Sequence, residues 1–407
     1  MSEIRLKSIS IENYRSFAGE QSFLFPNRAY SKPISIIGYN NAGKTNMMNA
    51  ILIGIGEKFV SANTFEKSDL HNLDLQNQIV IKSDIEASNY QTEYRGQVQT
   101  KTIGGIHTIS TSLIDGEINA KVEQSFFGAN KHYRIFYINF HKIKDEISTR
   151  KTSWGNLSSF LAKHIKSIVE NDLVMNAKKP DFERETKNST EKVLLDSRLS
   201  NFIEKIKVNY SKNLRGNNCN VEFGLPNYEE IFLQMVFKIG LNGNSNNLVS
   251  LEHFGDGYIS MFVMAVIQAI AESNTTDKCM FLFEEPESFL HENHQEYFYK
   301  MVLCALAEKG HQVIYTTHSD KMIDIFDTKS IIRIDYDDLT KRTLKKYNNI
   351  DDPNIQDNPI ISYDNFNSFI KSAEPNLNKI LFSRKVVLVE GPNDLLSYNF
   401  AIEKKVN

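Results

Sequence analysis

A single glycine-rich motif near the N-terminus places the strongest constraint on this chain. Residues 38–45 read Gly-Tyr-Asn-Asn-Ala-Gly-Lys-Thr and match the complete phosphate-loop pattern, GxxxxGK followed by Ser or Thr. An apolar strand pattern over 33–37 precedes the motif, and a helical pattern over 46–58 follows it. Backbone N–H groups of such a loop, with the helix N-terminus behind them, bind phosphate. A glycine turn that only joins a strand to a helix is the alternative, but it would not need all three parts in register.

The motif predicts a site for ATP and Mg²⁺. Lys44 would place a positive charge near the β- and γ-phosphates, and the Thr45 hydroxyl is a candidate Mg²⁺ ligand. We expect the nucleotide to be contacted by Gly38, Asn40, Asn41, Ala42, Gly43, Lys44, Thr45 and Asn46.

A second apolar run, 281–283, ends in Glu284-Glu285-Pro286-Glu287. A carboxylate at the end of a strand can hold Mg²⁺ through water, and its neighbour can polarise the attacking water. We therefore assign Glu284 to the metal and Glu285 to the general base. A solvated acidic turn is the alternative, but a buried run rarely ends in one by chance.

A third predicted strand, 312–316, leads to His318. Alone, a histidine at the end of a strand is more often a core or capping residue. After a phosphate loop and an acidic strand end, it is a candidate sensor of the γ-phosphate.

Glycines also precede the apolar helix predicted over 258–272. Gly255, Asp256 and Gly257 stand where a helix N-terminus could bind a second anion. A plain helix start is the alternative. Each monomer already has a phosphate loop, so we expect this second element to bind the nucleotide of an opposite subunit. The element therefore predicts a homodimer or a higher even oligomer.

Periodicity divides the rest of the chain. Residues 4–12 read as a strand, and residues 79–137 read as an antiparallel β region. Helical spacing then appears over 157–173 and 193–210, across a polar hinge at 176–191. The predicted parts are an ATPase lobe at 1–141, a helical insertion at 142–215, a second lobe at 216–348, a linker at 349–384 and a last part at 385–407. The second lobe has predicted strands at 221–237, 279–284, 312–316 and 330–334. The last part opens with a predicted strand over 385–389.

Composition and charge add limits to the function. Hydrophobic residues make up 41% and charged residues 24% of the 407 residues, as in globular proteins, and the net charge of −3 neither requires nor excludes nucleic acid. The insertion carries 16 Lys and Arg against 10 Asp and Glu, which suits a solvated helical face or an arm facing DNA or a second subunit. We expect a cytoplasmic protein, because the three cysteines are far apart and the N-terminus has no signal-peptide pattern. We expect no membrane span, because the longest apolar stretch, 259–271, is too short to cross a bilayer.

These motifs occur together in a known family. GYNNAGKTN, the FGDG element, FLFEEPESFLH, VIYTTHSDKM and KVVLVEGPND follow the order seen in OLD-family ATP-dependent nucleases, and the chain is also similar to the ATPase–nuclease subunit of the Gabija anti-phage system. The resemblance implies an α/β ABC/RecF-like P-loop ATPase head, with a mixed sheet, flanking helices and an antiparallel β lobe. It further implies a helical dimerisation insert, a C-terminal Toprim nuclease domain, DNA as substrate, and a helicase-like or nuclease partner protein.

The Toprim part of the resemblance rests on Val386 to Asp394. Glu390 would be a metal ligand and acid/base group of DNA cleavage, and Asp394 the second acidic residue of the pattern. The family's paired aspartates are expected further on, beyond the last residue given, Asn407. We therefore expect an incomplete Toprim domain and no DNA cleavage by these residues alone. A RecF- or SMC-like repair clamp is the alternative function, and this Toprim opening disfavours it.

Two features depart from typical ABC heads. Phe254 stands where those heads have a serine before the glycines. This departure, with the strand-rich start and the helical insertion, disfavours a transporter ATPase. The glutamine that usually faces the nucleotide has four candidates, Gln91, Gln97, Gln99 and Gln124.

Overall fold

The structure is a computed structural model. It describes residues 3–94, 97–124, 135–142, 173–195, 197–213, 238–240, 248–250, 253–273, 278–350, 377–383, 386–387 and 389–406. The chain divides into two units, one formed by residues 1–141 and 260–407 and the other by residues 142–259. Each unit is described by itself.

The first unit is centred on three strands in which every residue is buried: β3 (Ile34–Ile37), β10 (Met280–Glu284) and β11 (Gln312–Thr317). Continuous apolar runs of this kind form parallel sheets that are covered on both faces. β7 (Ile135–Asn139) and β12 (Ile331–Asp337) extend the sheet in parallel, and β13 (Arg342–Tyr347) closes one edge antiparallel. The order is β13-β12-β3-β11-β10-β7, so the carboxyl ends of the five parallel strands meet at one edge.

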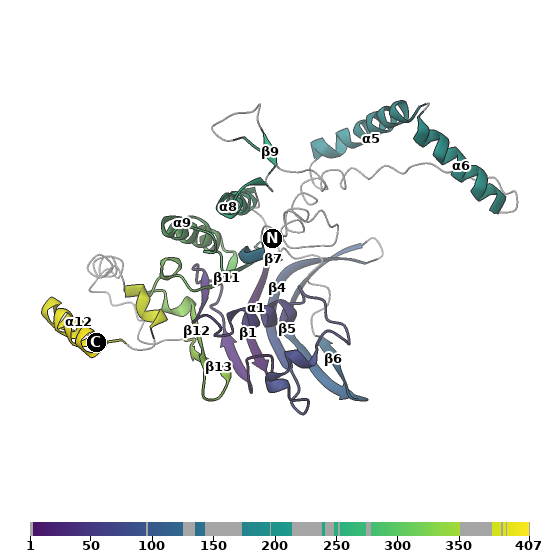
Figure 1. Cartoon of the computed structure of the whole chain (residues 1–407). Helices are drawn as coiled ribbons and strands as arrows, with labels where there is room; N and C mark the ends of the chain where they lie inside the picture. The colour runs from purple at the N-terminus through teal and green to yellow at the C-terminus, as the bar shows by residue number, and fades with distance from the viewer. Residues whose placement is uncertain are drawn as a thin grey trace. The chain divides into compact units, whose positions relative to one another are not determined.

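A second sheet is antiparallel, with the order β2-β1-β4-β5-β6. Its strands are β1 (Glu3–Glu12), β2 (Gln21–Leu24), β4 (Val80–Tyr94), β5 (Gln97–Ile114) and β6 (Glu117–Gln124). Helix α1 (Lys44–Gly54) contacts strands of both sheets (Figure 1). Its Met47, Met48 and Ile51 lie in the core that the two sheets share. The helix that follows the phosphate loop is therefore fixed by burial on two sides.

Helical segments connect the strands that form the site edge. Between β10 and β11 the chain forms α9 (Glu292–Phe298), a π-helical turn η6 (Tyr299–Cys304) and α10 (Ala305–Glu308). Helix α8 (Asp256–Ser273) precedes β10, and Gln268 donates a hydrogen bond to the carbonyl oxygen of Met301. The first unit also holds the 3₁₀ turn η9 (Leu377–Phe382) and helix α12 (Pro392–Val406). Within the described ranges, no helix is long and apolar enough to cross a membrane.

The second unit contains helices α5 (Leu173–Leu194) and α6 (Arg198–Asn213) and the short strands β8 (Lys238–Ile239) and β9 (Val249–Ser250). The predicted polar hinge at 176–191 is wrong, because these residues are helical and the break falls between α5 and α6. A helix without a wide apolar face can be stabilised by ion pairs between side chains one turn apart. Here Arg184 pairs with Asp181 at 2.6 Å and Lys187 with Glu191 at 3.9 Å.

Most strands predicted from apolar runs are confirmed as β1, β3, β10, β11 and β12. The antiparallel β region is confirmed for β4 to β6, but residues 135–137 belong to β7 of the parallel sheet. The helix predicted over 46–58 begins at Lys44 and ends at Gly54. The strand pattern at 221–237, the helical pattern before Leu173 and most of the linker lie outside the described residues.

The strand predicted over 385–389 is also wrong where the structure describes it. Val386, Val387 and Val389 lie outside any strand, and Val387 is 65% exposed. A strand needs a hydrogen-bonding neighbour, and no described strand pairs with these residues.

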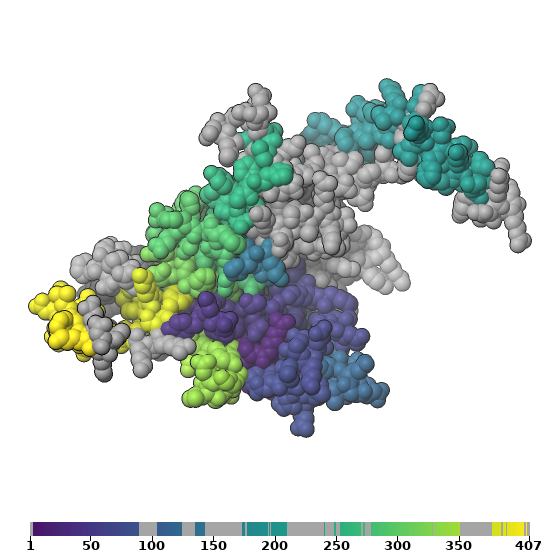
Figure 2. Space-filling view, viewed as in Figure 1, coloured from purple at the N-terminus to yellow at the C-terminus, as the bar shows by residue number. Residues whose placement is uncertain are grey.

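Strand β13 was not predicted, because its sequence RTLKKY is charged rather than apolar. It is held by the N-terminal residues, which lie beside it in Figure 2. The Thr343 N–H donates to the Ser16 carbonyl oxygen at 2.7 Å, and the Asn348 side chain pairs with both backbone groups of Leu24. Tertiary hydrogen bonds thus fix a strand that local sequence does not indicate.

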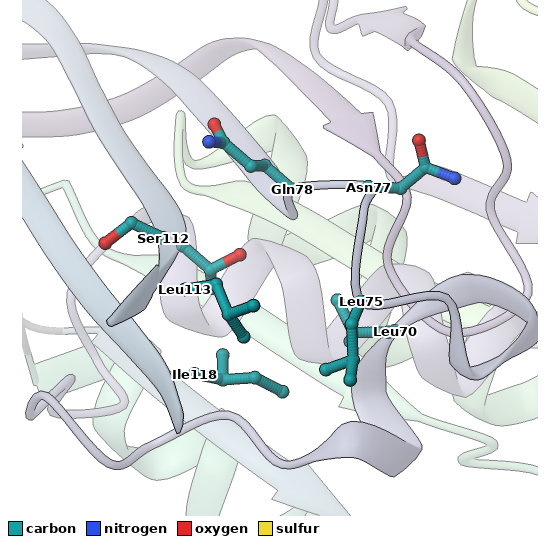
Figure 3. Close-up of a pocket in the computed structure, with 8 residues that line it drawn as sticks. Leu70, Leu75, Asn77, Gln78, Ser112, Leu113 and Ile118 are labelled. Carbon is teal, nitrogen blue, oxygen red and sulfur yellow. The ribbon is translucent and has the colours of Figure 1, made fainter. Parts of the chain in front are cut away.

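A small pocket opens beside the antiparallel sheet (Figure 3). Leu70, Leu75, Leu113 and Ile118 face it, with Asn77, Gln78 and Ser112 at its rim. None of the residues predicted to bind nucleotide lines this pocket.

Candidate nucleotide-binding site

The phosphate loop joins β3 to α1 and is closed by its own lysine. The Nζ of Lys44 donates to the carbonyl oxygens of Gly38 at 3.1 Å and Tyr39 at 3.2 Å. Asn41 and Gly43 have positive φ values of 67° and 100°. A Cβ on Gly38 would lie 2.2 Å from the carbonyl oxygen of Ile334, so close packing excludes a side chain there.

A polar network lies behind the loop. A Cβ on Gly43 would lie 2.5 Å from Thr343 Oγ1, which itself lies 2.9 Å from the Ala42 carbonyl oxygen and 2.7 Å from Ser16 Oγ. The Asn46 side chain donates to Ser16 Oγ at 2.9 Å. Asn46 thus contacts the N-terminal segment, and Ser16 and Thr343 support the loop although sequence reasoning did not single them out.

Glu284 is the last residue of β10 and is 4% exposed. Its Oε2 accepts hydrogen bonds from the Tyr137 hydroxyl at 2.6 Å and from Asn139 Nδ2 at 2.9 Å. Both donors come from β7, where Asn139 stands opposite Glu284 in the parallel register. One carboxylate oxygen is therefore fixed by two donors.

Glu285 follows in a left-handed conformation, with φ of 45°. Its N–H bonds the Thr316 carbonyl oxygen at 3.2 Å, which ties it to β11. Its Oε1 lies 3.9 Å from Lys44 Nζ, and its Oε2 lies 2.5 Å from His141 Nε2 and 3.7 Å from His318 Nδ1. Non-glycine residues rarely adopt such backbone angles, and those that do cluster at functional sites.

Glu287 is the most enclosed of the three carboxylates, at 3% exposure. Its Oε1 accepts from Thr317 Oγ1 and from the His318 N–H, each at 2.7 Å, and lies 3.1 Å from His318 Nδ1. Burial raises the pKa of Glu287 above its usual range, although these hydrogen bonds oppose the shift. Burial likewise lowers the pKa of Lys44, against the opposing effect of Glu285 and the other two carboxylates.

The structure thus gathers Lys44, Glu284, Glu285 and His318 at the carboxyl edge of the parallel sheet. Sequence reasoning missed Tyr137, Asn139 and His141; the available signal was the polar residues at the end of the apolar run of β7. The four glutamine candidates lie on β4, β5 and β6, and their side chains are outside the described part of the structure.

Two other groups of residues were predicted from the sequence, Gly255 to Gly257 and Glu390 with Asp394. Gly255 belongs to the second unit, and its carbonyl oxygen accepts from the N–H groups of Tyr258 and Ile259, so that α8 starts with Asp256 and Gly257. No described atom lies within 4 Å of a Cβ placed on Gly255. Glu390 is exposed before α12, and Asp394 lies in the first turn of that helix.

The side chains at the sheet edge fit Mg²⁺ better than they fit a metal whose ligands are all protein side chains. The described residues include no group of three or more His, Cys, Asp or Glu side chains that could hold an ion. Mg²⁺ at nucleotide sites takes one or two protein oxygens and completes its shell with phosphates and water. Glu284, whose Oε2 is already oriented, and Thr45 at the start of α1 are oxygen donors of that kind.

The chain is similar to several known proteins. The chain is 24% identical to the Old nuclease of Escherichia phage P2 over 99% of its own length and 70% of that protein. It is 20% identical to Endonuclease GajA of Bacillus cereus (strain VD045), over 98% of this chain and 68% of that one. A structure of the Smc head bound to the C-winged helix domain of ScpA covers 84% of the chain and is itself covered to 97%, with 14% identity and a TM-score of 0.48.

The resemblance to OLD-family proteins is therefore confirmed over nearly the whole chain. A sequence model of the family described as AAA ATPase domain matches residues 86–323, which include β7, β10, β11 and the carboxylates at their ends. The phosphate loop precedes the matched range. Because that range is more than half of the chain, the protein belongs to the AAA ATPase domain family and has the mixed α/β fold of a P-loop ATPase head.

Proposed function

We propose that this chain binds and hydrolyses ATP at the carboxyl edge of its parallel sheet. The observation that carries the proposal is the 3.9 Å approach of Lys44 Nζ to Glu285 Oε1. It places the cation of the phosphate loop beside a carboxylate that could activate water.

Each side chain has a role in this proposal. Lys44 binds the β- and γ-phosphates, and the loop N–H groups bind the phosphate oxygens. Glu285 accepts the proton of the attacking water, and His318 contacts the γ-phosphate. Glu284 and Thr45 would hold Mg²⁺, which neutralises phosphate charge when bound.

We further propose that ATP gates DNA cleavage by a Toprim domain to which Glu390 and Asp394 belong, in defence against phage. The names of the Old nuclease and Endonuclease GajA support the nuclease part, and the resemblance to the Gabija subunit supports the setting. The Gly255–Gly257 element would serve the nucleotide of a second subunit. A clamp that binds DNA under ATP without cutting it is the competing function.

The ATPase proposal is tested with Lys44→Ala and Glu285→Gln, with the exposed Lys300→Ala and Glu292→Gln as matched controls. Loss of a charged hydrogen bond should weaken ATP binding by roughly 10- to 150-fold in Lys44→Ala. Glu285→Gln should keep its affinity and lose about 10²- to 10⁴-fold in turnover. Phosphate release and binding of a fluorescent ATP analogue measure the two effects, and full turnover in Glu285→Gln would reject the assignment.

The nuclease proposal is tested by nicking of supercoiled plasmid with and without ATP. ATP-dependent nicking that Glu390→Ala abolishes supports gated cleavage. ATP-dependent DNA binding without nicking favours the clamp instead.

A further inference from the structure

His141 lies at the same sheet edge, in a turn that is fixed on both sides. The 3₁₀ turn η3 (Phe140–Lys142) follows β7 directly. Phe140 is fully buried, with ring centroids 6.3 Å from Phe283 and 5.8 Å from Phe298. The His141 N–H donates to Asn139 Oδ1 at 3.0 Å. The backbone that carries the imidazole is therefore anchored in the core of the first unit.

The imidazole itself contacts the segment after β10. His141 Nε2 lies 2.5 Å from Glu285 Oε2 and 3.2 Å from Ser288 Oγ. Its ring meets the Phe289 ring edge-on, with centroids 6.2 Å apart and an interplanar angle of 81°. Glu285 and Phe289 both have positive φ, of 45° and 66°, so the histidine contacts a turn whose backbone is held in an uncommon conformation.

Three nitrogens face the Glu285 carboxylate, and they are not equivalent. Lys44 Nζ at 3.9 Å and His318 Nδ1 at 3.7 Å lie beyond hydrogen-bond distance. Among the contacts described for this carboxylate, the one from His141 alone is within that distance. Lys44 and His318 have proposed contacts with phosphate. No phosphate contact is proposed for His141, so its role is argued from its contact with Glu285.

We propose that His141 is a positioning residue for Glu285, an inference that rests on the proposed ATPase function. A hydrogen bond from Nε2–H holds Oε2 and thereby directs Oε1 toward the phosphate loop. A general base acts only within hydrogen-bond reach of its proton, so a carboxylate free to rotate spends less time in the reactive orientation. His141 acts on turnover through Glu285 and does not contribute to ATP affinity.

The test compares His141→Ala, His141→Asn and His141→Gln in the whole chain, with the exposed His294→Ala as control. Asparagine is too short to reach Glu285, whereas glutamine can place its amide N–H near the position of Nε2. For alanine and asparagine, kcat should fall by roughly 10- to 100-fold, while KM for ATP and the affinity for a non-hydrolysable analogue stay within about twofold. Glutamine should recover most of kcat. Thermal unfolding of each variant identifies any that does not fold.

A double substitution separates this inference from the ATPase proposal. In the Glu285→Gln background, His141→Ala should cause no further loss, because the residue it positions is already inactive. Wild-type kcat in both short variants, failure of glutamine to recover activity, or an additive loss in the double variant would overturn the role of His141. Full turnover in Glu285→Gln alone would instead overturn the role of Glu285 as the base, and a wild-type chain without ATP turnover would overturn the ATPase proposal.

Discussion

The Tyr137 hydroxyl donates to Oε2 of Glu284 at 2.6 Å, and Asn139 donates to the same oxygen at 2.9 Å. Two donors on one oxygen leave Oε1 as the atom available to a cation. Partners of this kind orient metal-binding carboxylates, and their loss commonly costs 10- to 100-fold in metal affinity or activity.

We predict that Tyr137→Phe combined with Asn139→Ala raises the Mg²⁺ concentration needed for half-maximal ATP turnover by about tenfold. Glu284 remains in place but loses its fixed orientation. Tyr297→Phe, on the exposed face of α9, is the matched control. Titration of turnover with Mg²⁺ is the measurement, and an unchanged Mg²⁺ dependence would place the metal on another residue.

Alanine substitutions at Gly43 and Gly56 distinguish the effect of a steric clash from the effect of backbone strain. Both have positive φ, but a Cβ meets Thr343 Oγ1 at 2.5 Å at Gly43 and no described atom within 4 Å at Gly56. We predict that Gly56→Ala costs roughly 1–2 kcal/mol of stability and leaves ATP binding intact. Gly43→Ala should in addition weaken ATP binding, because the network behind the loop must move. Urea unfolding and analogue binding measure both; equal binding by the two variants contradicts the steric argument.

The site shows which contacts a sequence can predict. Glu284, Glu285 and His318 were predictable because each ends or directly follows a continuous buried strand. Lys44 was predictable because a complete motif surrounds it. The contact between Asn139 and Glu284 joins residues 145 positions apart and depends on the parallel register of β7 and β10. Local periodicity does not encode such pairing.

The charged strand β13 and the polar helix α5 were missed for a related reason. Tertiary hydrogen bonds hold β13, and side-chain pairs one turn apart support α5. Apolar patterns report neither kind of contact.

An even oligomer is predicted by the Gly255–Gly257 element. Its helix N-terminus can bind an anion, and in the proposed function the phosphate loop serves the chain's own nucleotide. Light scattering of Glu285→Gln with ATP should give twice the subunit mass or a higher even multiple. A single subunit's mass under these conditions would remove the reason for a second phosphate-binding element.

Glu287 should make stability fall as pH rises. Its folded-state pKa is raised by burial, so its contribution is complete below the unfolded value of about 4.3 and is lost as pH rises through the folded value. Glu287→Gln cannot ionise and should flatten the profile as pH rises above about 4.3. Urea unfolding across that range measures it, with the exposed Glu292→Gln as control. Equal slopes for Glu287→Gln and wild type would mean that the carboxyl stays in one state throughout.

His311 should act in the opposite direction, away from the nucleotide site. It precedes β11, at the amino end of the parallel strands, and its Nδ1 accepts a hydrogen bond from the Cys279 N–H at 2.9 Å. Burial, with Lys278 and Lys309 nearby, lowers the pKa of His311 to about 4. The folded value is below the unfolded one of about 6.5, so the neutral ring's contribution is complete above pH 6.5 and is lost as pH falls toward 4.

The full loss is roughly 3 kcal/mol, from 1.36 kcal/mol for each pKa unit. His311→Asn keeps an acceptor near Nδ1 and cannot gain a proton at these pH values, so its free energy of unfolding should fall less between pH 6.5 and 4.5. Some stability should be lost at every pH, because the Asn side chain cannot replace the edge-on contact of the ring with Phe281 at 5.3 Å. Urea unfolding at four pH values, with the exposed His294→Asn as control, measures the difference in slope. Parallel profiles for His311→Asn and wild type would show that the ring has the same pKa in the folded and unfolded chains, or that another group dominates the acid limb.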